Sequence, residues 1–315
     1  MAWSPLVVAW SPDQATLPTE GLPLGPWRPL VVAWSPVLVP LTRISVSPMK
    51  YAFMSFSCPD LDLPRMLSVA TDLGYDALEP RFGAGHHGIE LDAKAETLRA
   101  ARELSEARGV PFCCVSTSCR YADPSDSAQN VADTLRAIDV AAAAGSPRIR
   151  VFGGRIPPGV SRTEAIDLVA DSLGSVADRA SARNVTVCVE THDDWCDPEH
   201  VSALMQKVNH PNIAVNWDIM HPVRVAKKSM DQAFGALRPW IRHVHVHDGV
   251  EGADGQLKLV PIGEGAIDHG RALHLLKESG YEGFISGEWI RWEPPEVHLP
   301  RELAKLKALE AGRSG

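Results

Sequence analysis

Apolar and polar residues alternate between Val185 and His192, in the stretch VTVCVETH. A period of two is typical of a β-strand, so this pattern predicts a strand with one apolar face and a second face that ends in Glu190. Three later segments repeat the design, at residues 213–222, 241–249 and 283–291. Their polar positions include Asp218, a run of alternate histidines and Glu288. The sequence therefore predicts four strands that end in acidic or imidazole side chains.

Strand-like and helix-like segments alternate from Tyr51 onward. The predicted strands are residues 51–56, 77–82, 110–117, 148–152, 185–192, 213–222, 241–249 and 283–291. The helical patterns between and after them include residues 63–73, 93–108, 198–208, 228–237, 267–279 and 301–309. Two more lie on either side of the strand at 148–152: the first ends at residue 144, and the second begins at Ser161. Ser161 and Glu164 have the spacing of a capping box.

Eight strand-helix pairs in about 265 residues predict a (β/α)₈ TIM barrel, in which the active site lies at the carboxyl ends of the strands. A doubly wound sheet is the structural alternative. It would ordinarily have a glycine-rich phosphate loop after its first strand, and FMSFSCPDLD, at residues 53–62, has no glycine. A barrel also brings the ends of its last four strands to one point, whereas an open sheet would spread them out. The barrel is therefore favoured.

The first 48 residues differ from the rest. LVVAWSP occurs at residues 6–12 and again at 30–36, and prolines interrupt the apolar runs. No run approaches the roughly 20 apolar residues that span a bilayer, and no basic region precedes the apolar residues as in a signal peptide. We predict that residues 1–48 are an irregular extension, disordered or the product of a start codon assigned too far upstream, and that residues 49–315 form a single barrel domain.

The composition of the chain bears on its binding partners and its cellular compartment. The chain has 315 residues, is 45% hydrophobic and carries a formal net charge of -8, which argues against nucleic acid as a partner. Its six cysteines form no CxxC pair, which is typical of reduced thiols in a cytoplasmic protein. We expect no membrane partner. The sequence leaves the oligomeric state open, a homo-oligomer included.

Three carboxylates and one imidazole at the predicted strand ends form a set of ligands for a divalent cation, Mn²⁺, Mg²⁺, Co²⁺ or Zn²⁺. Taken singly, Glu190, Asp218 or Glu288 is equally well explained as a helix cap or a solvated charge. Their recurrence at equivalent positions favours a shared site.

Alternate residues of a strand share a face, so His243, His245 and His247 point to the same side of their strand. His245 stands three residues before Asp248 and is high enough on the strand to reach the rim, so we predict that it is the ligand. His247 is the second choice. The histidines that do not bind a metal would be ordinary polar residues of the barrel interior.

Other side chains have two interpretations each. His221 follows Asp218 in a D-x-x-H motif, where it either points inward before Pro222 or belongs to a capped strand end. His192 either swings over the site or lies on the surface. The remaining candidates either bind substrate or have a structural role. Arg81 and Arg291 suit substrate hydroxyls or a phosphate, and Trp289 and Trp292 suit a sugar ring. His86 and His87 lie in a glycine-rich loop that suits a lid.

The ordered motifs VETH, WDIMHP, HVHVHDG, PIGEGAID (Pro261 to Asp268) and SGEW resemble the sugar phosphate isomerase/epimerase family. This family is also called the xylose isomerase-like or AP endonuclease family 2 superfamily, and the resemblance covers Met49 to Leu309. It implies a (β/α)₈ barrel with one metal ion held by Glu190, Asp218, His245 and Glu288. In ketose 3-epimerase members, the glutamates matching Glu190 and Glu288 also exchange protons with the substrate, and the histidine matching His221 contacts it.

The sequence thus predicts an isomerase or epimerase of a carbohydrate, acting through an enediolate. We also assign substrate contacts to His192, His247 and Arg291. A metal-dependent dehydratase or lyase of a polyol-derived keto compound is the alternative, and a barrel that binds without turnover is less favoured. The family's DNA-repair branch needs two further zinc ions, for which the sequence offers only Asp254 and either His86 or His87. We rank DNA cleavage below sugar chemistry.

Overall fold

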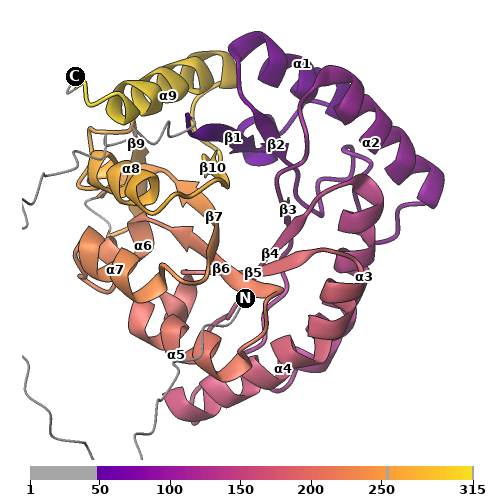
Figure 1. Ribbon diagram of the computed structural model, residues 1–315, viewed down its shortest axis with the longest axis vertical. Coiled ribbons are helices and arrows are strands. Elements are labelled where there is room, and N and C mark those ends of the chain that lie inside the picture. The colour runs from indigo at the N-terminus through magenta and orange to yellow at the C-terminus, as the bar shows by residue number, and fades with distance from the viewer. Residues whose placement is uncertain (1–47, 253–254, 314–315) are drawn as a thin grey trace, which may run out of the picture. The chain divides into compact units, whose positions relative to one another are not determined.

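The computed structural model describes residues 48–252 and 255–313, and eight parallel strands form one sheet in the order β2-β1-β10-β7-β6-β5-β4-β3. The strands are β1 (Lys50–Met54), β2 (Ala77–Glu79), β3 (Val115–Ser116), β4 (Arg148–Phe152), β5 (Thr186–Glu190), β6 (Ile213–Asp218), β7 (Ile241–Val246) and β10 (Phe284–Gly287). Parallel bridges from Leu78 to Phe112 and from Arg81 to Ser116 join the two edge strands. The sheet is therefore a closed barrel, as Figure 1 shows, and the predicted fold is confirmed.

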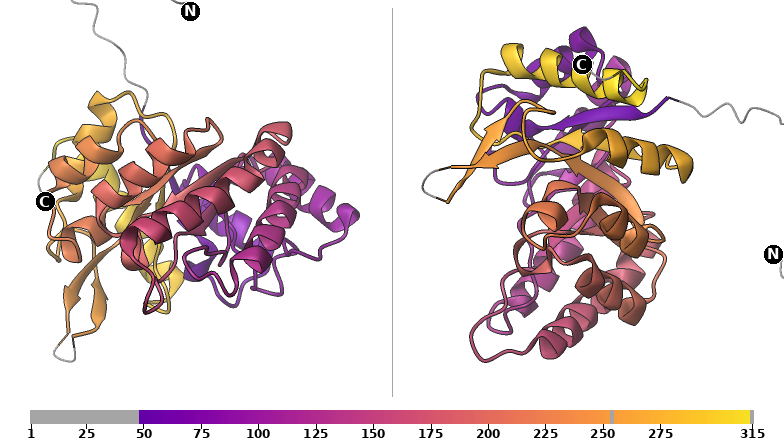
Figure 2. Two further views of the ribbon diagram at one scale, coloured as in Figure 1. Left: turned by 90° about the horizontal axis from the view of Figure 1, so that it is seen from below. Right: turned by 90° about the vertical axis from the view of Figure 1, so that its left-hand side faces the viewer.

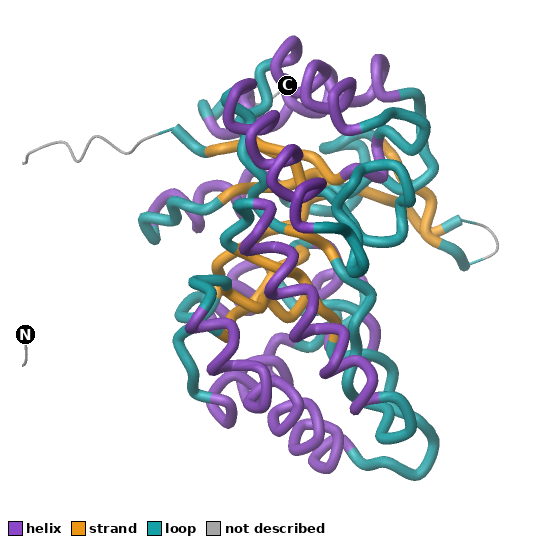
Figure 3. The backbone as a smooth tube through the Cα atoms, turned by 90° about the vertical axis from the view of Figure 1, so that its right-hand side faces the viewer, coloured by secondary structure: helices purple, strands orange, loops and turns teal. Residues whose placement is uncertain are grey.

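Helices surround the strands as an outer layer (Figures 1 and 3). They are α1 (Leu63–Leu73), α2 (Ala95–Arg108), α3 (Ser127–Ala144), α4 (Arg162–Ala182), α5 (Pro198–Val208), α7 (Met230–Leu237), α8 (His269–Glu278) and α9 (Pro295–Glu310). The predicted capping box opens α4: Glu164 N donates to Ser161 Oγ over 3.2 Å, and Ser161 N donates to Glu164 Oε2 over 2.8 Å. α9 begins six residues before its predicted start because Pro295 occupies its first turn, where proline needs no hydrogen bond.

Alternate residues of the strands lie in two different environments, one apolar and one polar. One set of positions, exemplified by Val187 and Trp217, joins the apolar core, and Trp217 packs on Phe234 of α7 with ring centroids 5.6 Å apart. The intervening set contains Glu190 and His245, which are both completely buried. The barrel interior is therefore polar where these strands end, which places ionisable side chains in a space shielded from water.

All predicted strands except residues 148–152 end earlier than their patterns suggested, and two of these ends show why. β6 stops at Asp218, and the short helix α6 (Met220–Arg224) follows, because the Asp218 carboxylate accepts a hydrogen bond from Met220 N over 2.8 Å. The segment 241–249 is divided between β7 and β8 (Asp248–Glu251), and β8 pairs antiparallel with β9 (Leu257–Val260). Figure 2 shows this hairpin projecting from the barrel. The alternation fails just after both strands end, since Met220 is apolar where a polar residue is expected and Asp248 is polar where an apolar one is expected.

Residues 1–47 lie outside the described residues, so the predicted extension and the domain boundary at residue 48 stay predictions. Among the described residues, none of the helices combines the length and the apolar composition that a membrane span requires.

Candidate metal centre and active site

Four neighbouring strands deliver the predicted ligands to one place. Glu190 and Asp218 are the last residues of β5 and β6, His245 lies in β7, and Glu288 directly follows β10. One ligand atom from each of the four lies within 4.8 Å of the other three. We call Glu190, Asp218, His245 and Glu288 the ligand cluster. All four are buried, and Glu288, at 7% exposed, is the most accessible.

His245 faces carboxylates on both sides of its ring. Its Nδ1 lies 3.1 Å from Glu190 Oε1 and 3.3 Å from Glu288 Oε2. Its Nε2 lies 3.1 Å and 3.2 Å from the two oxygens of Glu79. Burial alone would lower the pKa of His245, but the three surrounding carboxylates raise it well above its usual value. With Nδ1 toward the cluster and Nε2 held by a carboxylate, the ring has the arrangement typical of a metal-bound histidine.

Glu79, at the end of β2, was not among the predicted site residues. Ser116 Oγ donates to Glu79 Oε1 over 2.6 Å, and His243 Nε2 lies 2.8 Å from Glu79 Oε2. We call Glu79, Ser116 and His243 the Glu79 network. Burial alone would raise the pKa of Glu79, but His245 and His243 lower it well below its usual value. Glu79 ends β2 as Glu190 ends β5, but the predicted strand 77–82 placed Glu79 in its interior.

Arg150 in β4 is the second residue that the sequence did not single out. Its Nε lies 3.1 Å from Glu190 Oε2, and its Nη1 donates to the backbone oxygen of Thr117 over 2.8 Å. Its guanidinium also stacks over the ring of Phe152, 4.1 Å from the centroid. The two oxygens of Glu190 therefore face different cationic groups, Oε1 toward His245 and Oε2 toward Arg150.

His192, His221 and His247 form a row of imidazoles beside Asp218. His247 Nε2 lies 2.9 Å from Asp218 Oδ2, and His221 Nε2 lies 3.7 Å from the same oxygen. The His221 ring is 5.6 Å from the His247 ring and 4.7 Å from the His192 ring. Because β5 ends at Glu190, the following turn swings His192 to the cluster side, one of its two predicted orientations. Asp218, His221 and His247 form a second group of potential metal ligands.

Within the described residues, the other candidates belong to no group of potential metal ligands and have contacts outside the ligand cluster. Arg291 is exposed and lines a cavity of about 460 Å³ with Phe56 and Trp292. The Trp289 side chain is 1% exposed, packs against His298 with ring centroids 5.4 Å apart, and belongs to the lining of the same cavity. Arg81 stacks over Phe56, 4.7 Å from the ring centroid.

His87 differs from the expected exposed loop histidine. It is 2% exposed and neither ring nitrogen has a hydrogen-bond partner in the described chain, whereas its neighbour His86 is exposed. Neither residue belongs to a group of potential metal ligands within residues 48–252 and 255–313. Asp254, the other candidate for an additional zinc site, lies outside the described residues.

The donor set of the ligand cluster fits a divalent cation. Asp218 Oδ2 and Glu190 Oε2 are buried and accept no hydrogen bond of regular geometry from the described residues. Leaving carboxylate oxygens buried in this way costs free energy, which a cation bound to them would offset. Three carboxylates and one imidazole suit Mn²⁺, Mg²⁺, Co²⁺ or Zn²⁺, and no thiolate in the cluster selects a softer metal.

Comparisons with known proteins agree with the barrel fold. Residues 67–309 match the model of a family described as xylose isomerase-like TIM barrel. A putative hydroxypyruvate isomerase of Mus musculus is 25% identical over 166 residues, which cover 49% of this chain but only 57% of the mouse protein. The L-ribulose-5-phosphate 3-epimerase UlaE of Escherichia coli K12 is 26% identical over 268 residues, which cover 78% of this chain and 90% of that enzyme.

Solved structures share the fold at lower identity. The probable 3-DHS dehydratase AsbF of Bacillus anthracis has a TM-score of 0.69 and 20% identity, covering 82% of this chain and 98% of that one. The IOLI protein, solved with a zinc atom, has a TM-score of 0.67 and 19% identity, covering 84% and 97%. At these identities the likeness establishes the barrel alone.

Proposed function

The chain belongs to the xylose isomerase-like TIM barrel family, and from this membership and its ligand cluster we propose that it is a divalent-metal-dependent isomerase or epimerase of a sugar or sugar phosphate. The observation that supports this most strongly is the approach of Glu190, Asp218, His245 and Glu288 to within 4.8 Å of one another. The similarity to a putative isomerase and to a 3-epimerase agrees with it.

Glu288 acts as the base in this proposal. Burial alone would raise its pKa, but His245, the largest opposing influence, and Arg150 lower it to about 2, so Glu288 is ionised and able to accept a proton at neutral pH. A cation held by the ligand cluster would stabilise the enediolate that forms when the proton beside the substrate carbonyl leaves. Glu190 is the proposed second base, on the opposite side of the reacting carbon.

The orientation of Glu190 bears on which reaction follows. Inversion at one carbon needs two bases, whereas aldose-ketose isomerisation moves one proton between neighbouring carbons and needs one. Arg150 lies 3.1 Å from Glu190 Oε2, and His245 lies 3.1 Å from Glu190 Oε1. Whichever oxygen of Glu190 serves as the second base therefore already has a cationic neighbour. Glu288 has no such restraint from an arginine within 4 Å among the described residues. His192, His221 and His247 are the proposed contacts for substrate hydroxyls, and Arg291 for a more distant group.

A dehydratase is the second candidate. Glu288 would remove the same proton, and the substrate would then lose a hydroxyl group as water. The similarity to a 3-dehydroshikimate dehydratase of Bacillus anthracis supports this candidate, but the similarity covers only half of this chain. DNA cleavage has less support, since His86 and His87 join no group of potential ligands in the described part of the chain.

A metal-supplemented screen in D₂O tests the proposal. Ketoses, inosose-like polyols and keto acids are the substrates, an abasic DNA duplex is the control, and deuterium incorporation beside the carbonyl is the measurement. We expect exchange with at least one ketose and a loss of about 10²- to 10⁴-fold in Glu288→Gln. Full exchange by Glu288→Gln would remove Glu288 from its role, and cleavage of the duplex alone would favour the endonuclease.

A further inference from the structure

We propose that the amino-terminal end of the barrel, opposite the ligand cluster, binds a small organic anion with two or more phosphate or carboxylate groups. A cavity of about 400 Å³ lies there. Its lining comes from the first residues of β4 and β7, from the carboxyl ends of α7 and α8, and from the segment before β10. None of these residues belongs to the ligand cluster, so the site is independent of the proposed function.

Three arginines from separate elements line the cavity: Arg148, Arg238 and Arg242. None of them forms an ion pair with a carboxylate of the described residues, whereas Arg183 and Arg271 do. Glu282 is the one carboxylate of the lining. In a chain with a net charge of -8, the lining of this cavity is therefore locally positive and attracts anions.

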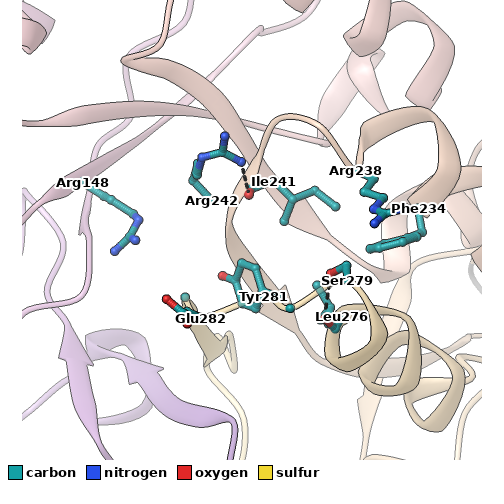
Figure 4. A pocket seen from close by; sticks show the side chains of 11 residues that line it. Arg148, Phe234, Arg238, Ile241, Arg242, Leu276, Ser279, Tyr281 and Glu282 are labelled. Atoms are coloured by element: carbon teal, nitrogen blue, oxygen red, sulfur yellow. Dashed lines mark hydrogen bonds between the residues drawn. The ribbon is translucent and has the colours of Figure 1, made fainter. Parts of the chain in front are cut away.

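Hydrogen bonds to backbone oxygens fix three of the side chains that line the cavity. Figure 4 shows Arg148 and Arg238 on opposite sides of Tyr281, and the Tyr281 hydroxyl donates to the backbone oxygen of Phe284 over 2.9 Å. Arg242 Nη1 donates to the backbone oxygen of Ile241 over 2.8 Å, and Arg148 Nη1 to that of Cys113 over 3.4 Å. Each guanidinium keeps further N–H groups for a ligand, because arginine has five.

A purely structural role accounts for only part of this arrangement. Arg238 directly follows α7, and a cation there favours the negative end of the helix dipole. Arg148 and Arg242 lie on strands, where this reason does not apply. Their shared property is the cavity that they line.

The shape and the charge together indicate the class of ligand. A cavity of this size is within the range of about 300 to 1,000 Å³ that small-molecule sites occupy. Guanidinium groups bind phosphate and carboxylate through paired hydrogen bonds. Because three arginines from separate elements line the cavity, a ligand with two or more anionic groups can pair with more of them than a single anionic group can.

Isothermal titration calorimetry of the full chain, without added divalent cation, tests the proposal with three probes. Pyrophosphate and tricarballylate represent the phosphate and carboxylate sources, and orthophosphate represents a single anionic group. We expect one saturable site for pyrophosphate or tricarballylate and weaker binding of orthophosphate. The double variant Arg148→Gln/Arg238→Gln should bind the preferred probe at least about tenfold more weakly, since two charged hydrogen-bonding groups are lost.

The double variant Arg65→Gln/Arg99→Gln is the matched control, because it removes two exposed arginines of α1 and α2 that have no ion pair in the described chain. It should bind as the wild type does. Equal weakening in both double variants would mean that net charge alone decides, and would overturn the proposal. So would wild-type binding by Arg148→Gln/Arg238→Gln, the absence of saturable binding in the low millimolar range, or loss of binding in Asp218→Ala, which would place the anion in the ligand cluster.

Discussion

The Glu79 network and the ligand cluster occupy the same barrel interior but differ in how their charges are balanced. In the Glu79 network, both oxygens of the single carboxylate face close partners: Ser116 and His245 lie near Oε1, and His243 and His245 near Oε2. In the ligand cluster, three carboxylates share one imidazole and the neighbouring Arg150 and His247, and two of their oxygens accept no regular hydrogen bond from the described residues.

This difference explains how one polar interior serves two purposes. Both oxygens of Glu79 are satisfied, although His243 Nδ1 has no hydrogen-bond partner among the described residues, so the paired carboxylate stabilises the barrel and orients its partners. The ligand cluster is incompletely satisfied and has excess negative charge, which is the state that a bound cation would correct. His245 belongs to the ligand cluster and contacts Glu79, so the satisfied Glu79 carboxylate fixes the orientation of a ligand in the unsatisfied cluster.

The largest effect is expected for Asp218→Ala. Asp218 belongs to both groups of ligands that lie beside the imidazole row, so its loss removes a ligand that no neighbour replaces. We expect metal affinity to fall by more than about 100-fold, beyond the 10- to 100-fold effect of outer-shell changes. Elemental analysis after dialysis against Mn²⁺ measures this. Asp231→Ala, on exposed Asp231 of α7, is the control, and an unchanged metal content in Asp218→Ala would remove Asp218 from the ligands.

Arg150→Met tests whether the cluster suffers from excess negative charge. The substitution leaves Glu190 buried beside two other carboxylates, and breaking a buried ion pair typically costs about 3 to 5 kcal/mol. We expect a loss of about 3 kcal/mol in the free energy of urea unfolding without metal, and a smaller loss with Mn²⁺ present. Arg183→Met breaks an exposed pair and should cost less than about 1 kcal/mol. Equal losses in the two variants, or a loss that Mn²⁺ does not reduce, would contradict the charge imbalance.

The difference between the two networks also explains what the sequence could predict. Glu190, Asp218 and Glu288 recur at the ends of period-two strands, and a closed barrel has to bring such ends together, so their convergence followed from pattern and fold. The partners of Glu79 did not follow, because His243 is 164 residues away and its contact depends on the register of the closed barrel. Arg150 was missed because an arginine within a strand has no sequence signature that distinguishes a buried ion pair from a solvated charge.

Local hydrogen bonds account for two of the differences in element boundaries. Asp218 accepts from Met220 N and His221 N, and this ends β6. Asp248 accepts from Gly263 N and Gly265 N, which ties the start of the β8–β9 hairpin to the loop after it. Periodicity reports burial and does not report which carboxylate binds a backbone amide.

Glu79→Gln should have a moderate effect that is specific to the metal. The glutamine keeps the size of the side chain but removes the negative charge that holds Nε2 of His245, and outer-shell changes of this kind weaken metal binding by about 10- to 100-fold. Competition with a fluorescent chelator measures the affinity for Mn²⁺. Glu302→Gln alters a buried carboxylate that accepts from Ile262 N, outside the site, and should leave the affinity unchanged. A Glu79→Gln protein with wild-type affinity would show that the Glu79 network stabilises the fold only.

The smallest effect concerns His192, whose pKa depends on Asp193 and on carboxylates of the ligand cluster. Burial alone would lower its pKa, but the contact with Asp193, together with Glu190 and Glu288, raises it to about 9. By contrast, burial outweighs Glu79 and lowers the pKa of His243 in the Glu79 network. Titration of the imidazole proton signals by NMR should therefore give values on opposite sides of the usual value near 6.5 for these two histidines.

The sign of the linked stability change follows from the raised pKa of His192. Protonated His192 favours the folded state, so its contribution is complete below about pH 6.5 and is lost as the pH rises through about 9. Because the His192 side chain is 35% exposed, we expect a contribution below about 1 kcal/mol. His192→Gln should flatten the dependence of the unfolding free energy on pH between these values. Saturating Mn²⁺ should lower the pKa of His192, because the cation neutralises Glu190 and Glu288, and a pKa unmoved by metal would mean that Asp193 alone sets it.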